Sequence, residues 1–453
     1  MVIGILARFQ WKSDPDEGGR IASILGFQIP LGITAILMAS GFSIMNAGLT
    51  RTPDPEFALA AFALGQTVTN MFGSPVWIAR QMLLAYSTDR KSMKAALRVA
   101  AVVSALVMAW IAVLAYTPLG RIVYMDIFGA SEALFPEVLS VVRICIFLPL
   151  VHFIRIWPQA ILMRGRRTIL MTWAMVLRLI LMVIMALYLP GTGFLEGAAL
   201  GACLWIAGMG SEGIFCIFFA WPHRMTVHGK EPASDATPAT ERDCVRFLLP
   251  MIAQGLLMTF SLPAVNAGLA RTLSPERNLA VFQVSWSIAF MFLAFIFVNL
   301  SQTVLVLLRD ARWWRSLKRV GIGLAALDSV ALVLFVLSGA SDWVLLNAIG
   351  VEAALIPATR TVLLLMAASP FLAGFVELHS GIALKRGQTP LVGIGKGLDL
   401  TVVLLVVFGL SHFFPGLEAN VGPLGFAAGL TVNYIFLRRV IPEPRLEEAP
   451  RAE

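Results

Sequence analysis

The side chains of this chain best suited to bind a ligand are polar and charged residues inside long apolar segments. His152, Arg155 and Gln159 are spaced so that they share one face of a helix. A guanidinium can bind a carboxylate or phosphate through two parallel hydrogen bonds, so we expect Arg155 to contact an anionic ligand, with weaker contacts from His152 and Gln159. The competing interpretation is hydrogen bonding that only holds helices together.

Further candidates for substrate binding lie in four other apolar segments. Arg178 stands on a methionine-rich helical face and is the second candidate for binding an anion. Gln66 and Asn70 belong to another polar stripe. Asn46 and Asn266 end two apolar segments, each two residues before a glycine, and helix C-capping is their alternative role.

Acidic side chains inside apolar segments gather in the second half of the chain. Because charges are costly in hydrocarbon, we treat these acidic residues and the basic residues near them as candidates for coupling or gating. The candidates are Asp328, Glu377, His379, Lys396 and Asp399. Lys396 and Asp399 are three residues apart, so we predict a local ion pair. The alternative partner of Asp399 is Arg178, which occupies the equivalent position of an internal repeat.

That repeat determines how the candidates are positioned. The segment N-A-G-L-T-R-T at Asn46 returns as N-A-G-L-A-R-T at Asn266, and eleven of seventeen positions in 46–62 and 266–282 are identical at an offset of 220. Pro30 and Pro250 keep the same offset. We predict that these prolines are hinges in the first span of each half, with static bends as the alternative.

Composition indicates an integral membrane protein. The chain is 58% hydrophobic and 14% charged, with a mean hydropathy of +0.81, whereas soluble domains carry roughly 25% charged residues. About twenty apolar residues cross a bilayer as a helix, which predicts spans at 21–48, 57–86, 95–116, 136–163, 168–189, 194–221, 245–269, 278–308, 320–337, 354–384, 390–410 and 418–437. The predicted fold is therefore all-α, with about twelve transmembrane helices in two parallel six-helix repeats.

The loops predict the orientation. With a cytoplasmic N-terminus, 25 of the 35 Lys and Arg residues lie on the cytoplasmic side and five lie outside, so we expect a multi-pass protein of the inner (plasma) membrane with both termini cytoplasmic. The predicted parts are an N-terminal segment 1–20, a first lobe 21–221, a cytoplasmic linker 222–243, a second lobe 244–440 and a disordered tail 441–453. This topology explains the pI of 9.6 without nucleic-acid binding.

No enzyme or cofactor motif is present in the sequence. The chain has no G-x-S-x-G, P-loop or H-E-x-x-H motif, and its four cysteines and five histidines have no metal-ligand spacing. We therefore expect no cofactor and no metal site. A membrane-embedded transferase would need an acid and a base at one membrane face, and the separated carboxylates argue against it.

Several residues and the duplicated layout resemble a known superfamily. The segments I-P-L-G-I-T at Ile29 and R-F-L-L-P at Arg246 look like those of the multidrug, oligosaccharidyl-lipid and polysaccharide (MOP) exporters. This superfamily includes the MATE transporters. Within it, the chain most resembles the progressive ankylosis protein family. The resemblance implies a monomeric, V-shaped pair of lobes that exports small anions such as citrate, pyrophosphate or nucleotides by alternating access, either passively or as a secondary active transporter. The alternatives are a lipid-linked oligosaccharide flippase and a multidrug exporter.

Coupling to an ion is left open by the sequence. Cation-coupled members of the superfamily usually carry an acidic residue in the first or seventh span. Neither 21–48 nor 245–269 contains Asp or Glu, so coupling to H⁺ or Na⁺ by that route is not expected.

Overall fold

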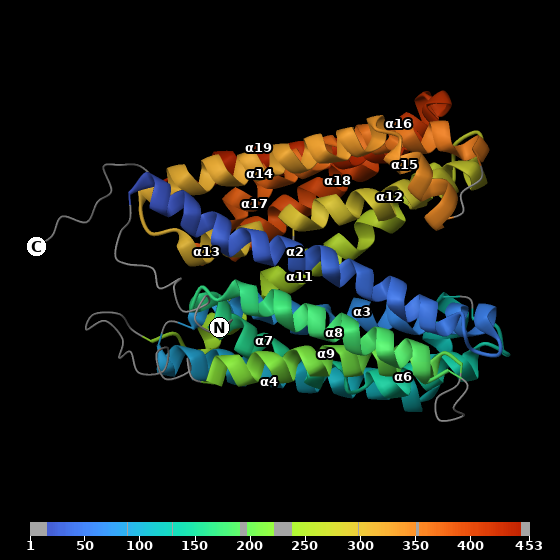
Figure 1. Cartoon of the computed structure of the whole chain (residues 1–453), viewed down its shortest axis with the longest axis horizontal. Coiled ribbons are helices and arrows are strands. Elements are labelled where there is room, and N and C mark those ends of the chain that lie inside the picture. The colour runs from blue at the N-terminus through green and yellow to red at the C-terminus, as the bar shows by residue number, and fades with distance from the viewer. Residues whose placement is uncertain are drawn as a thin grey trace, which may run out of the picture.

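The computed structural model describes residues 16–444 except 88, 129, 191–196, 222–237, 298 and 350–352. Throughout the described part, every regular element is a helix, and the helices form an elongated bundle of two lobes (Figure 1). The predictions for residues 1–15, for most of the linker and for the tail after residue 444 lie outside the described residues.

The first lobe contains the helices of the first repeat. They are α2 (Glu17–Leu49), α3 (Pro55–Tyr86), α4 (Arg90–Tyr116), α5 (Pro118–Arg121), the π-helix η1 (Ile122–Ile127), α6 (Phe135–Cys145), α7 (Leu148–Arg164), α8 (Thr168–Tyr188) and α9 (Ala199–Ala220). The fourth predicted span is thus two helices, α6 and α7, and Pro149 lies in the first turn of α7.

The second lobe repeats this order. Its elements are α11 (Glu241–Leu269), α12 (Pro275–Phe297), α13 (Leu300–Leu307), α14 (Ala311–Leu337), α15 (Ala340–Trp343), the π-helix η3 (Val344–Ile349), the 3₁₀-helix η4 (Ala353–Leu355), α16 (Ile356–Met366), α17 (Ala368–Lys385), α18 (Thr389–Phe413), the 3₁₀-helix η5 (Pro415–Asn420) and α19 (Val421–Val440). Even the short pair α5 and η1 has its counterpart in α15 and η3, so the duplication extends to minor elements.

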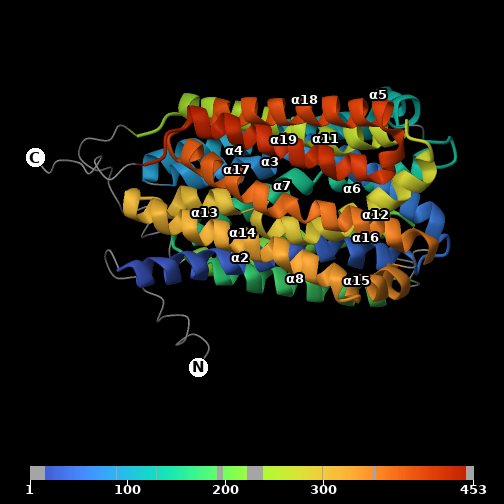
Figure 2. The same cartoon turned by 90° about the horizontal axis from the view of Figure 1, so that it is seen from above.

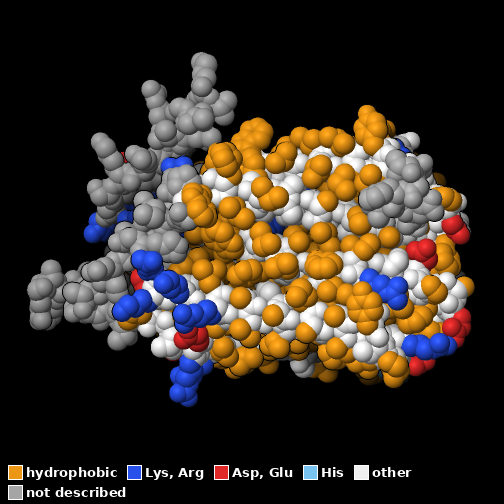
Figure 3. All heavy atoms as spheres, turned by 90° about the horizontal axis from the view of Figure 1, so that it is seen from below, with side chains coloured by type: hydrophobic (Ala, Val, Ile, Leu, Met, Phe, Trp, Pro, Cys, Tyr) orange, Lys and Arg blue, Asp and Glu red, His pale blue; other side chains and the backbone are white. Residues whose placement is uncertain are grey.

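The helices have the length and composition of membrane spans. Eleven helical segments of the described chain are long and apolar enough to cross a bilayer. The one predicted span outside this set, 57–86, corresponds to α3, which is 32 residues long; polar residues such as Gln66 and Asn70 lower its mean hydropathy. Apolar side chains cover the middle of the surface, whereas Lys and Arg gather towards one end (Figure 3). The prediction of an all-α, multi-pass membrane protein is confirmed.

Helices α2 and α11 cross between the lobes. Helix α2 packs on α8 and α9 of its own lobe and on α12, α13 and α14 of the other, and α11 packs on α18 and α19 but also on α3 and α4. Both helices continue through the prolines of the repeat, Pro30 and Pro250. The Gly26 carbonyl, which Pro30 leaves without its helical donor, accepts from Thr168 Oγ1 at 3.4 Å. Hinging at these prolines stays a prediction.

The hydrophobic interior has three parts. Near the end where α2 begins and α19 ends, called here the terminus end (Figure 2), one core contains residues of both lobes. Towards the other end, each lobe has its own core. Hydrogen bonds join the lobes near the terminus end, because Gln28 Nε2 donates to the Phe295 carbonyl at 3.2 Å and Asn299 Nδ2 to the Leu31 carbonyl at 3.0 Å. This arrangement is a V that is closed at the terminus end.

Some predicted boundaries differ from the structure. Helix α2 begins at Glu17, and α11 begins at Glu241, where Thr240 and Asp243 form a capping box. The start of the predicted disordered tail is wrong. Ile441 is fully buried, and the Glu443 carboxylate accepts from Lys318 Nζ at 2.7 Å and from Trp314 Nε1 at 3.1 Å. Residues 441–444 are therefore fixed against the second lobe.

Candidate functional site

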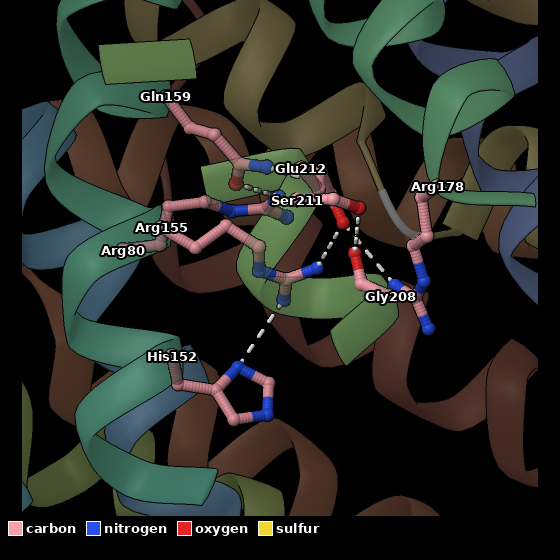
Figure 4. Close-up of polar contacts among 8 residues, drawn as sticks. All are labelled: Arg80, His152, Arg155, Gln159, Arg178, Gly208, Ser211 and Glu212. Atoms are coloured by element: carbon pink, nitrogen blue, oxygen red, sulfur yellow. Dashed lines mark hydrogen bonds and ion pairs between the residues drawn. The ribbon is translucent and has the colours of Figure 1, made fainter. Parts of the chain in front are cut away.

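The first lobe contains a buried carboxylate held by two arginines (Figure 4). Arg155 on α7 and Arg178 on α8 both donate to Glu212 Oε2 on α9, at 3.0 and 3.2 Å. Gln159 Nε2 donates to the other carboxylate oxygen, Oε1, at 2.6 Å. Gly208 leaves room for α8 beside α9, since a Cβ there would come within 2.7 Å of Sδ of Met182 and within 3.3 Å of Cγ of Arg178.

Two further residues extend this group. Arg80 Nη1 on α3 donates to Gln159 Oε1 at 3.4 Å, and Arg155 Nη2 lies 3.2 Å from His152 Nδ1. Because a guanidinium can only donate, Nδ1 of His152 must accept, and the imidazole is neutral in this arrangement. We call these six residues the arginine cluster: Arg80, His152, Arg155, Gln159, Arg178 and Glu212.

The arginine cluster carries more positive than negative charge. It contains three arginines and one carboxylate, that of Glu212, which leaves an excess of two positive charges; Arg155 and Arg178 contact this carboxylate, whereas Arg80 contacts Gln159. Arg155, Arg178 and Glu212 are 6%, 2% and 1% exposed. The Nε atoms of Arg155 and Arg178 have no hydrogen-bond partner. Buried charge without compensation is costly in a membrane protein, so the arginine cluster is well suited to receive an anion.

The structure brings together the residues of the predicted stripe and adds two that were not predicted. His152, Arg155, Gln159 and Arg178 all belong to the arginine cluster. Glu212 falls well inside a predicted span of the first half, whereas Glu137 and Glu196 lie next to predicted span ends, but nothing in the sequence indicated what Glu212 contacts. It lies inside α9. Arg80 was not a candidate from the sequence, because an arginine this close to the end of a predicted span can extend to the membrane surface; in the structure it instead binds Gln159.

The other substrate-binding candidates have no hydrogen bond to the arginine cluster in the described structure. Gln66 and Asn70 are half-buried on α3, and Nε2 of Gln66 is buried without a partner. Asn46 is exposed and Asn266 is half-buried. Asn46 lies inside the last turn of α2, whose C-cap is Thr50, and Asn266 lies inside the last turn of α11, whose C-cap is Ala270. The capping interpretation is therefore wrong.

The second lobe pairs its own buried charges. Lys396 Nζ donates to Asp399 Oδ2, and the two residues are 9% and 1% exposed. The predicted local pair is thus present, whereas Arg178 binds Glu212 instead of Asp399. The pair lines a cavity of about 80 Å³. Its wall includes Trp286 and Phe426, which stack with ring centroids 4.8 Å apart.

The remaining coupling candidates are dispersed. Asp328 is half-buried on α14, and its Oδ2 has no partner. Glu377 is buried on α17. His379 contacts the Phe375 carbonyl at 2.9 Å, and its Nε2 lies 3.6 Å from Glu443. Among the described residues, no three His, Cys, Asp or Glu side chains are placed to hold a metal ion.

Comparison with solved structures defines the class of fold. The chain is similar to a multidrug resistance MATE family transporter of the MOP superfamily in an outward-facing conformation, with a TM-score of 0.73, 16% identity, and coverage of 92% of this chain and 94% of that one. A MOP superfamily transporter from Pyrococcus furiosus gives 0.73 and 16%, with coverage of 94% and 97%. A mutant of the Vibrio cholerae MATE transporter VcmN gives 0.71 and 15%, with coverage of 93% and 96%. The fold is that of a MATE-like membrane transporter.

The family comparison is more specific. Residues 235–423 match the model of the progressive ankylosis protein (ANKH) family, which confirms the resemblance predicted from the sequence. No curated protein matches the chain. The solved structures that share this fold are described as transporters.

Proposed function

We propose that this protein transports a small organic or phosphorylated anion across the membrane by alternating access between its two lobes. Citrate, pyrophosphate and nucleotides represent the class. The observation that carries the proposal is the arginine cluster, in which Arg155 and Arg178 bind the single carboxylate of Glu212 and a third arginine, Arg80, binds only the amide of Gln159. A carboxylate or phosphate would offset the excess charge and bind the guanidinium N–H groups that have no partner.

The polarity of the first lobe supports an anion over a cation. One structural neighbour is a multidrug resistance transporter, but for the Pyrococcus furiosus transporter a "reverse polarity of binding pocket suggests different function". In the present chain, the charged groups of the arginine cluster are predominantly guanidinium groups. Such a lobe repels cationic drugs and attracts carboxylates and phosphates.

The architecture supports alternating access. The lobes share one core at the terminus end and have separate cores at the other end. A transporter of this design exchanges that arrangement for one closed at the opposite end. The excess of Lys and Arg in the loops supports a cytoplasmic terminus end in the plasma membrane.

The orientation is tested by labelling. A single cysteine introduced at position 230 of the linker, in a background without native cysteines, is expected to react with a membrane-impermeant maleimide only after the cells are opened. A cysteine at position 51 is the matched control and should react in intact cells. Labelling of position 230 from outside would contradict the orientation.

The substrate class is tested at Arg155. Changing Arg155 to Gln or Lys is expected to lower citrate or pyrophosphate flux into liposomes by about tenfold to a hundredfold, because a charge-assisted hydrogen bond contributes roughly 1.5–3 kcal/mol and lysine cannot bind an anion through two parallel bonds. Glu212 keeps Arg178 as a partner in both variants, so both should fold.

The control for that experiment is Arg143, which is exposed on α6 and lies 5.5 Å from the Tyr116 ring. Arg143→Gln removes the same charge and should leave flux within about twofold of the wild type. Expression and thermal unfolding are measured first for every variant. Normal flux in both Arg155 variants, or a wild-type protein that moves only cationic drugs, would defeat the anion proposal. Movement of a lipid-linked oligosaccharide would favour a flippase.

A further inference from the structure

Arg166 has an unfavourable backbone conformation. It lies in the turn between α7 and α8 with φ of +57°, a left-handed conformation that is costly for a residue with a Cβ. The equivalent turn of the second lobe, 221 residues later, has Gly387 with φ of +70°. Where one repeat uses glycine, the other therefore uses a strained arginine. This exchange points to a role for the arginine side chain.

The Arg166 side chain crosses the interface between the lobes. Its guanidinium carbon lies 5.7 Å from the ring centroid of Trp313, a fully buried residue of α14 in the second lobe. Arg309 lies 5.4 Å from the same ring. A guanidinium that stacks on an aromatic face keeps its N–H donors in its own plane. Both arginines therefore retain donors for an anion.

Two more cations lie beside these arginines. Lys385, the last residue of α17, donates to the Leu305 carbonyl at 3.3 Å, and its charge is near those of Arg164 and Arg309. Burial, followed by repulsion from Arg309, lowers the pKa of Arg166. Among the described residues, none of these four cations forms an ion pair with a carboxylate.

The repeat-equivalent turn of the second lobe, which contains Gly387, contacts the first lobe differently. There the turn with Gly387 borders a cavity of about 410 Å³, which is also lined by Tyr86 of the first lobe and by Asp243, Arg246 and Phe247 of α11. The rings of Tyr86 and Phe247 pack against each other there with centroids 5.6 Å apart, so the lobes are in contact although the position equivalent to Arg166 is a glycine without a side chain. Packing alone does not require Arg166, and like charges on the two sides of an interface oppose its closure.

We propose that Arg164, Arg166, Arg309 and Lys385 form a phosphate-binding site that spans both lobes at the terminus end. Two of these cations come from each lobe, so the site is complete only when the lobes are together at that end. A phosphate group bound there offsets the repulsion and stabilises this closed arrangement, since a ligand favours the state that it binds better. The same chemistry is offered by an anionic phospholipid headgroup and by a soluble phosphate compound. The site is separate from the arginine cluster.

The experiment measures the distance between the lobes in the full-length protein. Spin labels are placed at exposed positions 91 and 439, one on each lobe, in a background without native cysteines. Inorganic pyrophosphate is titrated into nanodiscs of phosphatidylcholine, and a second series contains phosphatidylglycerol without pyrophosphate. Either addition is expected to increase the closed population at the terminus end. A response to pyrophosphate identifies a soluble ligand, and a response to phosphatidylglycerol identifies a lipid.

Variants in the turn between α7 and α8 distinguish phosphate binding at this site from a general effect of surface charge. Arg166→Gly and Arg166→Asn suit the left-handed backbone, so thermal stability without ligand should not fall, while the affinity for the effective phosphate probe is expected to fall about tenfold. Arg167→Gln, one residue along, removes the same charge and should change affinity by less than twofold. No response to either probe, an unchanged affinity in both Arg166 variants, or an equal loss in Arg167→Gln would overturn the proposal.

Discussion

Replacing Glu212 by Ala is expected to destabilise the folded protein by about 3–5 kcal/mol, the usual cost of leaving buried charge without its partner. The substitution leaves Arg155 and Arg178 without the carboxylate that both contact and removes the partner of Gln159 Nε2. Glu212→Gln removes the negative charge but keeps a hydrogen-bond acceptor, so its effect should be smaller. Thermal unfolding of the purified protein measures both.

A double variant checks the physical cause. Adding Arg178→Met to Glu212→Ala removes one of the unpaired charges and should recover part of the lost stability, because residues in direct contact have non-additive effects. The matched control is Glu418→Ala, which removes an acidic residue whose nearest cation, Arg277, is 4.0 Å away at the surface. Stability of Glu212→Ala equal to that of the control would mean that the arginines are not held by this carboxylate.

The second large effect is expected at the ion pair of the other lobe. Asp399→Ala leaves Lys396 buried without its partner, and we expect a loss of about 3–5 kcal/mol in the free energy of unfolding. The double variant Lys396→Met with Asp399→Leu should recover most of that loss, since a buried pair can often be replaced by apolar residues of similar volume. Denaturation of the two single variants and the double variant forms a complete cycle.

The contrast between the lobes is the informative result. The Lys396–Asp399 pair is neutral by itself, so an apolar replacement leaves no charge behind. The arginine cluster cannot be neutralised in this way, because removal of Glu212 with one arginine still leaves two. A double variant of Lys396 and Asp399 that is as unstable as Asp399→Ala would show that the pair also makes contacts that apolar residues cannot supply.

Local features of the fold could be predicted from the sequence. Hydropathy located the spans, and the repeat at Asn46 and Asn266 predicted two equivalent halves. The Lys396–Asp399 pair was also predictable, because residues three apart on a helix are neighbours whatever surrounds them. The breaks between α6 and α7 and between α16 and α17 were not located, since a short interruption hardly alters the average hydropathy of a span.

The sequence by itself determined that polar side chains share a face of α7, because helical periodicity fixes which residues lie on one side of a helix. Only the tertiary structure decided what that face meets. Arg155 and Glu212 are 57 residues apart, and Arg80 and Gln159 are 79 apart. Their contacts depend on how α3, α7, α8 and α9 are rotated and tilted against one another. Side-chain packing between helices sets those angles, and periodicity within a single helix carries no information about them.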